Sequence, residues 1–237
     1  MAERPAPPLP PVSVLMPAYN EEAGIAFTVE TTSPVLDRLF DDYELIVIND
    51  GSRDGTAAVL EGLQPRFPRL KVLSYAPNRG YAEALRRGFA ASSKPFVFFT
   101  DADLQFDVAE LPLLFEALGD GALAVGFRKD RRDPWHRKIY SRTYNWMQRT
   151  LLGIHATDIN CAFKLFRREF ITGIPLHAES FVINAEIFLR ARQRGLLVAE
   201  VGVTHRERAR GSTTVRPSTV LRTLGEMVRL RFARVRA

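Results

Sequence analysis

The first half of the chain repeats one pattern: a short apolar run, then polar residues, then a segment of helical composition. Apolar runs predict five strands, at residues 12–16, 43–48, 70–75, 96–100 and 122–127. Helices are predicted between them, at residues 54–63, 81–91 and 109–118, with another from residue 21 that Pro34 breaks or restarts. Strands and helices that alternate at this spacing form right-handed β-α-β units. We therefore predict an α/β fold with a mostly parallel central sheet flanked by helices.

Polar residues follow three of the predicted strands, at residues 17–21, 49–52 and 101–105. The carboxyl ends of parallel strands lie along one edge of a sheet, where open sheets of this kind bind their ligands. Asp50, Asp101 and Asp103 are therefore expected to come close together at this edge. Because like charges a few ångströms apart repel, a bound cation or ligand would have to compensate them.

Asp101, Asp103 and Gln105 occupy alternate positions directly after an apolar run. In an extended chain, residues two apart point the same way, so three oxygens could face one hard cation. Such a cation keeps some waters and takes its other ligands from a substrate phosphate. Two exposed loop acids are also common, and Asp-x-Asp alone favours that simpler interpretation. The neighbouring polar strand ends favour a metal–diphosphate site instead.

The glycine patterns of two common nucleotide-binding folds are absent from the sequence. It contains neither Gly-x-x-x-x-Gly-Lys nor Gly-x-Gly-x-x-Gly, so a nucleotide would have to be held by side chains and metal at the edge of the sheet. Cys161 is the single cysteine, which excludes an intrachain disulfide and fits a cytoplasmic location.

Charge is distributed unevenly along the chain. The formal net charge is +6, but residues 1–127 carry 18 acidic and 10 basic side chains, whereas residues 128–237 carry 9 acidic and 23 basic ones. An acidic half suits cations, and a basic half suits phosphates, nucleic acid or an anionic membrane surface. A solvated basic surface without a partner is the simpler alternative.

The second half of the sequence predicts further helices and strands. An amphipathic helix is predicted at residues 135–152, a helix at 181–194, a strand at 196–203 and a basic amphipathic helix at 218–234. The last helix could lie on an anionic membrane or dock on the rest of the protein. We predict three parts: a Pro-rich disordered leader at 1–11, one domain at 12–214, and the basic C-terminal helix at 215–237. No apolar run approaches the roughly 20 residues of a membrane-spanning helix.

Several motifs together resemble a known family. Residues 14–21 (Val-Leu-Met-Pro-Ala-Tyr-Asn-Glu), 48–56, 78–80 and 101–105 are similar to those of the family-2 glycosyltransferases of GT-A fold. Gly126-Phe-Arg128, Arg137-Lys-x-x-Ser141-Arg and Arg208-x-x-Gly211 resemble more specifically the polyprenyl-phosphate branch of that family. This branch includes dolichyl-phosphate mannose synthases and bactoprenol glucosyltransferases. The resemblance covers residues 12–214.

The resemblance implies an inverting, metal-dependent enzyme that moves a hexose from a GDP- or UDP-sugar to a polyprenyl phosphate. The implied nucleotide-binding residues are Pro17, Tyr19, Glu21, Asp50 and Asp101. The implied ligands of Mg²⁺ or Mn²⁺ are Asp101, Asp103 and Gln105. The implied acceptor-phosphate residues are Arg128, Arg137, Ser141 and Arg208. The residues implied nearest the chemistry are Asp103, Arg128 and Asp158.

The nature of the acceptor decides which residues matter. A lipid phosphate is already anionic near neutral pH, because the second pKa of a phosphate monoester is ~6, so it needs Arg forks more than a base. A sugar or metabolite hydroxyl would need a general base, for which Asp158 is the candidate. Both acceptors stay open, as does a non-catalytic module that binds membrane or nucleic acid. Nucleic acid is not expected, since aromatic residues are not interleaved with the terminal arginines as a base-stacking platform would require. A peripheral position on the cytoplasmic face of a membrane is expected.

Overall fold

A single seven-stranded sheet organises the chain. The computed structural model describes residues 7–129, 149–207 and 225–230. The strand order is β3-β2-β1-β4-β6-β5-β7, and every neighbouring pair is parallel except the two pairs that involve β6. The strands are β1 Val12–Ala18, β2 Tyr43–Asp50, β3 Leu70–Tyr75, β4 Phe96–Thr100, β5 Leu123–Arg128, β6 Phe163–Arg167 and β7 Val198–Val203.

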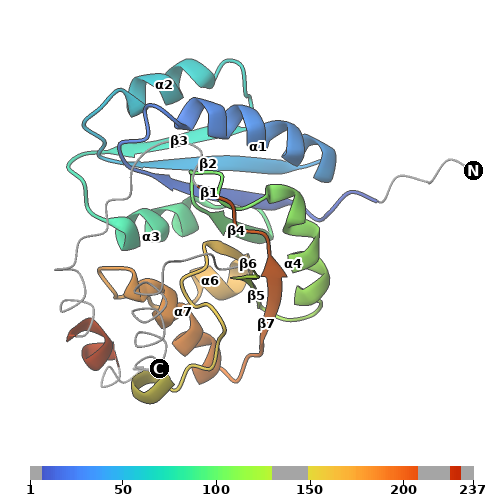
Figure 1. Cartoon of the computed structure of the whole chain (residues 1–237), viewed down its shortest axis with the longest axis vertical. Coiled ribbons are helices and arrows are strands. Elements are labelled where there is room, and N and C mark those ends of the chain that lie inside the picture. Colours follow the sequence, from blue (N-terminus) through green and yellow to red (C-terminus); the bar gives the residue numbers. More distant parts are fainter. Residues whose placement is uncertain (1–6, 130–148, 208–224, 231–237) are drawn as a thin grey trace, which may run out of the picture.

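Helices cover the sheet on both sides. They are α1 Ile25–Leu39, α2 Thr56–Leu63, α3 Tyr81–Ala91, the 3₁₀ turn η1 Val108–Glu110, α4 Leu111–Leu118, α6 Arg168–Thr172 and α7 Val182–Gln193. In Figure 1, α1 and α2 lie above the β1–β2 part of the sheet and α3 lies below it. The predicted α/β fold with a mostly parallel sheet is confirmed.

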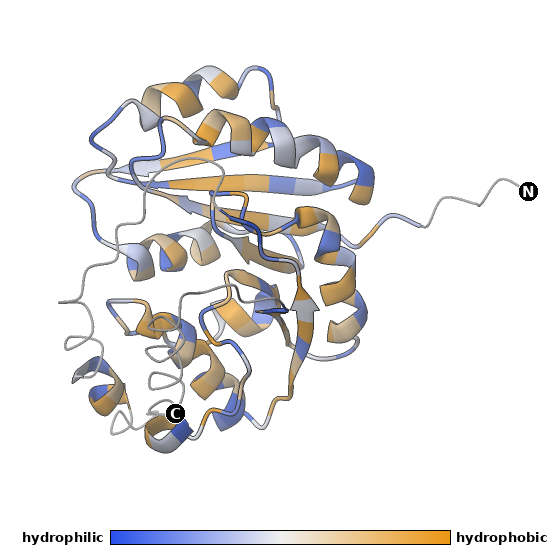
Figure 2. Cartoon of the chain, in the orientation of Figure 1, coloured by the Kyte–Doolittle hydropathy of each residue, from blue (hydrophilic) through white to orange (hydrophobic). Residues whose placement is uncertain are grey.

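The central strands are apolar because both of their faces are covered. All eight residues of β2 are buried, as are six of the seven residues of β1. Strands buried on both faces read as continuous apolar runs and not as alternating ones. Figure 2 shows this as hydrophobic colouring along the middle of the sheet. The predicted bounds of the β3 and β4 strands and of the α3 helix match the structure.

Helix α1 differs from the prediction at Pro34. The helix continues from Ile25 to Leu39 with Pro34 inside it, so the expected break or restart is wrong. A proline inside a helix leaves the carbonyl four residues earlier without its partner. Here Pro34 and Glu30 are both exposed, so water can bind the carbonyl that the proline leaves unpaired. The buried side of the helix, which includes Val29 and Leu36, holds it on the sheet.

Strand β6 runs opposite to all the other strands. It lies between β4 and β5, with Lys164 opposite Phe99 on one side and opposite Val125 on the other. An antiparallel strand begins at the edge where its parallel neighbours end. The segment just before β6 therefore lies beside the carboxyl ends of β4 and β5.

The described part of the C-terminal segment packs on the domain. Residues 225–230 are helical, and Met227 and Leu230 belong to the buried core. Glu226 accepts a hydrogen bond from Ser180 Oγ at 2.8 Å, just before α7, while Val228 is 44% exposed. Within the described ranges, no helix has both the length and the apolar character needed to cross a membrane.

Glu44 joins three segments at the amino-terminal edge of the sheet, opposite the polar strand ends. It is 3% exposed, and its carboxylate accepts hydrogen bonds from Ser13 Oγ, Lys71 Nζ and both the N–H and the Oγ of Ser93, the last two at 2.7 and 2.9 Å. Burial alone would raise the pKa of Glu44, but the hydrogen bonds from Lys71, Ser13 and Ser93 outweigh it and hold the pKa at about 2.

Replacing Glu44 by Gln is expected to reduce the free energy of unfolding at pH 7 by about 2–3 kcal/mol, because the charged hydrogen bonds are lost. The folded pKa of Glu44 lies below its ordinary value of 4.5, so its stabilisation is complete above that value and is lost as pH falls toward 2. Urea unfolding should therefore show that the difference in free energy of unfolding between wild type and Glu44→Gln is smaller at pH 3.5 than at pH 7. Glu61→Gln, on the exposed side of α2, is the control. Equal stability of Glu44→Gln and wild type at pH 7 would refute the assignment.

Candidate functional site

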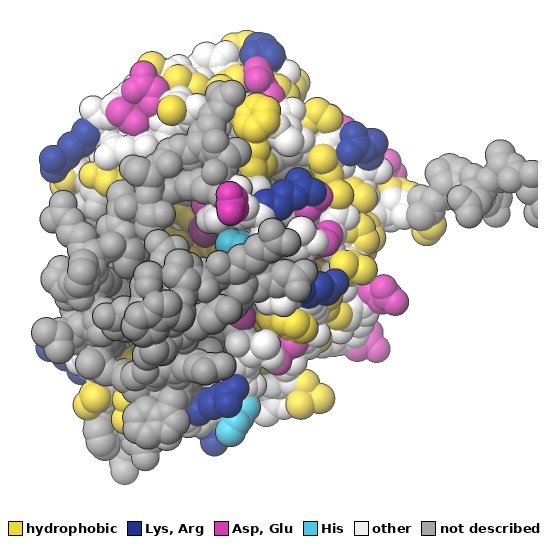
Figure 3. All heavy atoms as spheres, in the orientation of Figure 1, with side chains coloured by type: hydrophobic (Ala, Val, Ile, Leu, Met, Phe, Trp, Pro, Cys, Tyr) yellow, Lys and Arg dark blue, Asp and Glu magenta, His cyan; other side chains and the backbone are white. Residues whose placement is uncertain are grey.

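The candidate site lies along the carboxyl-terminal edge of the sheet. Five segments meet there: those after β1, β2, β4 and β7, and the one before β6. In Figure 3, acidic, basic and histidine side chains gather near the middle of this face, beside the atoms drawn in grey. The polar strand ends thus lie along one edge of the sheet as predicted, but among the described residues Asp50, Asp101 and Asp103 do not form a group that could hold a metal.

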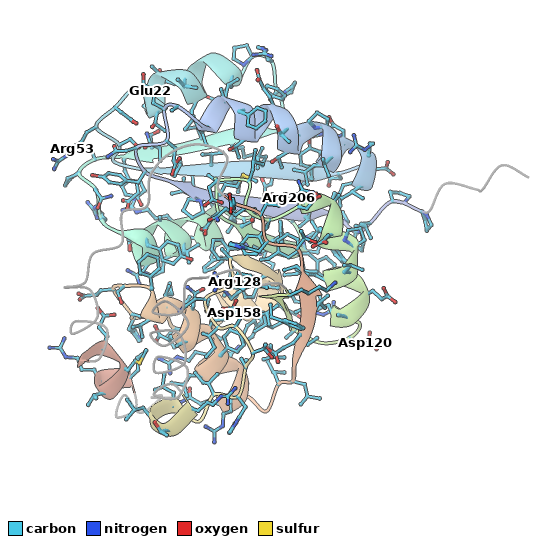
Figure 4. All side chains as sticks on the ribbon, in the orientation of Figure 1. Glu22, Arg53, Asp120, Arg128, Asp158 and Arg206 are labelled. Carbon is cyan, nitrogen blue, oxygen red and sulfur yellow. The ribbon has the colours of Figure 1, made fainter. Side chains whose placement is uncertain are left out.

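The segments after β1 and β2 are joined by hydrogen bonds. The Asn20 N–H donates to Ser52 Oγ at 3.0 Å, and the Arg53 N–H donates to Asn20 Oδ1 at 2.8 Å. The Glu21 N–H donates to Thr56 Oγ1 at 2.9 Å. Figure 4 shows Arg53 at the outer end of this pair of loops. The loops therefore form one wall, with the partly exposed Tyr19 at its inner end.

Asp50 uses its carboxylate to fix a neighbouring turn. Its oxygens accept hydrogen bonds from Asn78 Nδ2 at 2.9 Å, the Arg79 N–H at 2.8 Å and the Gly80 N–H at 2.9 Å, and the side chain is buried. Both oxygens are thus engaged within the protein. Asp50 and the turn that it holds form the floor at the end of β2, and Pro17 lies in β1 next to Ile48 of β2.

The segment after β4 is a turn and not an extended chain. Strand β4 ends at Thr100, and Leu104 has a φ of +57°, in the left-handed region. The expectation that residues 101–105 continue in extended form is therefore wrong. The turn is held by the Gln105 N–H, which donates to Asp103 Oδ1 at 3.1 Å, and by Thr28 Oγ1, which donates to the Ala102 carbonyl at 2.9 Å.

Asp101 and Asp103 fit a divalent cation by their chemistry. Both are partly exposed, and hard cations such as Mg²⁺ and Mn²⁺ prefer carboxylate oxygens. No group of three or more His, Cys, Asp or Glu side chains that could hold a metal occurs in the described ranges. The pair would therefore hold a cation that takes its remaining ligands from amide, water or phosphate oxygens. The Gln105 amide, the third predicted ligand, donates from Nε2 to the Arg206 carbonyl at 3.2 Å.

The segment after β7 is bound to this turn, which the sequence analysis did not predict. The Arg206 N–H donates to the Gln105 carbonyl at 2.7 Å, and Arg206 Nη2 lies 2.6 Å from Asp107 Oδ2. The His205 and Phe106 rings lie 5.1 Å apart. Polar residues follow β7 as they follow β1, β2 and β4. This pattern in the sequence would have identified the segment.

Arg128 and Asp158 form a bidentate ion pair. Arg128 Nε lies 2.6 Å from Asp158 Oδ2, and Nη2 lies 3.1 Å from Oδ1, with side-chain exposures of 18% and 7%. Figure 4 shows the two side chains side by side below Arg206. The Thr157 N–H, next to Asp158, donates to Glu200 Oε1 of β7 at 2.7 Å. The structure thus unites two predicted site residues that are 30 positions apart in the sequence.

The remaining predicted acceptor-phosphate residues are Arg137, Ser141 and Arg208, and all three lie outside the described residues. Sequence reasoning also assigned no role to Lys164. This lysine lies on β6 between the Asp101 turn and the Arg128–Asp158 pair, and it is wholly buried.

Comparisons with known proteins agree on one family. The model of the family described as "Glycosyl transferase family 2" matches residues 13–173. Similar curated proteins include undecaprenyl-phosphate 4-deoxy-4-formamido-L-arabinose transferases. That of Aeromonas hydrophila subsp. hydrophila is 34% identical, over 85% of this chain and 62% of its own length. That of Serratia proteamaculans is 32% identical, over 87% and 63%. The chain spans about three fifths of the length of these relatives.

Similar solved structures include glucosyl-3-phosphoglycerate synthase from Mycobacterium tuberculosis. Its complex with phosphoglyceric acid has a TM-score of 0.68 and 25% identity, covering 94% of this chain and 79% of that one. Its complex with Mn²⁺, uridine-diphosphate and glucosyl-3-phosphoglycerate has a TM-score of 0.66 and 27% identity, covering 93% and 76%. The arrangement of the sheet and helices is therefore shared with a glycosyltransferase.

Replacing Gly51 by Ala tests the floor formed by Asp50. Gly51 has a φ of +63°, and a Cβ there would lie 2.4 Å from the Asn78 backbone nitrogen. We expect Gly51→Ala to lower the free energy of unfolding by about 2 kcal/mol or more and to displace the turn that Asp50 holds. Chemical denaturation measures the loss. Gly62→Ala, in α2 with no atom within 4 Å of the added Cβ, should be neutral or slightly stabilising. Similar behaviour of the two variants would contradict the assignment.

Proposed function

The chain belongs to glycosyl transferase family 2 and has the GT-A fold, and from this we propose that it transfers a sugar from a nucleotide-sugar to a polyprenyl phosphate. The observation that carries the proposal is the Arg128–Asp158 pair beside the Asp101 turn, because it sets an oriented guanidinium next to a potential metal–diphosphate site. The curated relatives' names, which specify undecaprenyl phosphate, support this acceptor.

On the donor side, Asp101 and Asp103, joined by Gln105, would hold Mg²⁺ or Mn²⁺. The bound cation would offset the negative charge that develops on the departing nucleoside diphosphate. Pro17, Tyr19 and Glu21 would contact the base and ribose above the floor that Asp50 fixes. The complexes of the synthase that contain Mn²⁺ and UDP-glucose support this arrangement.

On the acceptor side, Arg128 would grip the lipid phosphate. A guanidinium is a planar, permanently charged fork that matches the geometry of a phosphate, and the pairing with Asp158 fixes the orientation of this fork. Asp158 would orient the fork and would not remove a proton, because the phosphate is already anionic. Arg137, Ser141 and Arg208 would complete the grip. Attack from the face opposite the leaving group would invert the anomeric carbon.

The comparisons support one class of donor. The relatives' name specifies an L-arabinose derivative, a five-carbon sugar, whereas the synthase complexes contain UDP-glucose. A UDP-linked pentose or hexose is therefore the proposed donor class, ahead of the GDP-hexoses. A lipid acceptor places the site at a membrane surface, and the exposed Val228 and Arg229 of the C-terminal helix would face it.

A second candidate keeps the donor and changes the acceptor to a hydroxyl on a small phosphorylated molecule. The similarity to glucosyl-3-phosphoglycerate synthase favours it. Asp158 would then have to act as a general base. Its two oxygens are held by the Arg128 guanidinium at 2.6 and 3.1 Å, which makes it a poor proton acceptor. The polyprenyl phosphate proposal is therefore preferred.

With undecaprenyl phosphate, Mn²⁺ and a panel of UDP- and GDP-sugars that includes an L-arabinose derivative, the protein should form a lipid-linked sugar, detected by mass spectrometry. Asp103→Asn should lower kcat/KM about 100-fold, because the metal loses a charged ligand. Exclusive transfer to 3-phosphoglycerate or another hydroxyl acceptor would overturn the lipid-phosphate assignment.

Arginine and aspartate variants separate the two acceptors. For a lipid phosphate, Arg128→Ala should lower kcat/KM about 100-fold, since a charge-assisted fork is lost, and Asp158→Asn about 10-fold, since only orientation suffers. A hydroxyl acceptor predicts the reverse order. Arg66→Ala is the matched control and should leave the rate unchanged, because Arg66 follows α2 and forms an exposed ion pair with Glu30 of α1.

A further inference from the structure

Lys164 is a charged side chain in the middle of the sheet. It is 0% exposed, and its Nζ donates to the Cys161 carbonyl and to Asn184 Oδ1, the latter at 2.9 Å. Nζ also lies 5.5 Å from the centre of the Phe99 ring. Within the described residues, no carboxylate lies within ion-pair distance of Nζ. Burying an ammonium costs several kcal/mol, and hydrogen bonds to neutral acceptors offset only part of that cost.

The position of Lys164 connects the two sides of the candidate site. Its register partners are Phe99, two residues before Asp101, and Val125, three residues before Arg128. Burial lowers the pKa of Lys164 to about 8, against the opposing influence of Cys161, Asp158 and Asp101. Both site carboxylates, Asp101 and Asp158, therefore lie close enough to influence the amine.

Lys164 contacts the turn that carries Asp158. The Cys161 N–H donates to the Asp158 carbonyl at 3.2 Å, and the Cys161 carbonyl accepts from Lys164 Nζ. Asn184 lies in α7 with 1% exposure, and its Oδ1 accepts the other hydrogen bond from Lys164 Nζ. The ammonium therefore fixes the turn at residues 158–161 against α7, and this turn sets where Asp158 meets Arg128.

We propose that Lys164 is a positioning residue: through the turn at residues 158–161 it holds Asp158, and through Asp158 it orients the Arg128 guanidinium toward the acceptor phosphate. The inference rests on the proposed function. The geometry predicts different effects on the two substrates. The segments after β1 and β2, which form the donor wall, make no hydrogen bond to Lys164. Loss of the ammonium should therefore weaken acceptor use and spare donor binding.

The test compares Lys164→Met with wild type in two assays. The KM for undecaprenyl phosphate should rise about 10-fold or more, while the Kd of the UDP-sugar with Mn²⁺, measured by calorimetry, should stay within about 2-fold. Met keeps the unbranched shape, so the fold is expected to persist, as circular dichroism will check. Lys94→Met is the matched control, since Lys94 pairs with Asp42 at the opposite edge of the sheet. It should leave both constants unchanged.

Two further variants make the result decisive. In an Asp158→Asn background, Lys164→Met should raise the acceptor KM by less than 2-fold, because Lys164 acts through Asp158. Asn184→Leu removes one hydrogen-bond acceptor of the ammonium and should raise the acceptor KM about 3-fold. This variant provides the test if Lys164→Met does not fold. The inference would be overturned if the acceptor KM were unchanged in the variants, or if donor and acceptor binding weakened equally. It would also be overturned if Lys164→Met raised the acceptor KM as much in the Asp158→Asn background as in wild type. Wild-type protein that fails to use undecaprenyl phosphate would instead refute the proposed function.

Discussion

The insertion of β6 in the antiparallel direction is the constraint on which the candidate site depends. A wholly parallel sheet would bring the end of every strand to the carboxyl edge but would leave the chain before β6 at the opposite edge. Because β6 is reversed, its first residues and the turn before them lie beside the ends of β4 and β5. That is why Asp158 reaches Arg128, and why Lys164 lies between the Asp101 turn and the Arg128–Asp158 pair.

Site residues in this fold also hold the protein together. Asp50 accepts three hydrogen bonds from the turn at residues 78–80, and Asp158 accepts both bonds of the Arg128 fork. A carboxylate used in this way is fixed in position before any ligand arrives, which reduces the ordering cost of binding. It also makes Asp158 an orienting group more than a base, which is consistent with an acceptor that needs no deprotonation.

Sequence patterns predicted the strands and helices well, because apolar runs and helical periodicity are local signals. The direction of β6 could not be predicted in this way, since a buried strand has the same composition whichever way it runs. They failed at residues 101–105, where the left-handed Leu104 replaces an extended chain. Lys164 was overlooked because only the three-dimensional packing shows that this lysine is wholly buried.

The proposed reaction must bring two anions together, the diphosphate of the donor and the phosphate of the acceptor. Two unit charges 4 Å apart repel by about 4 kcal/mol at an effective dielectric constant of about 20, so each anion needs its own compensation. The chain's charge asymmetry meets this need. The acidic half supplies Asp101 and Asp103, which suit a cation for the diphosphate, and the basic half begins with Arg128, the first arginine of the acceptor side. Strand β6 lies between these two groups of charges, and its buried Lys164 holds the turn that carries Asp158 on the acceptor side.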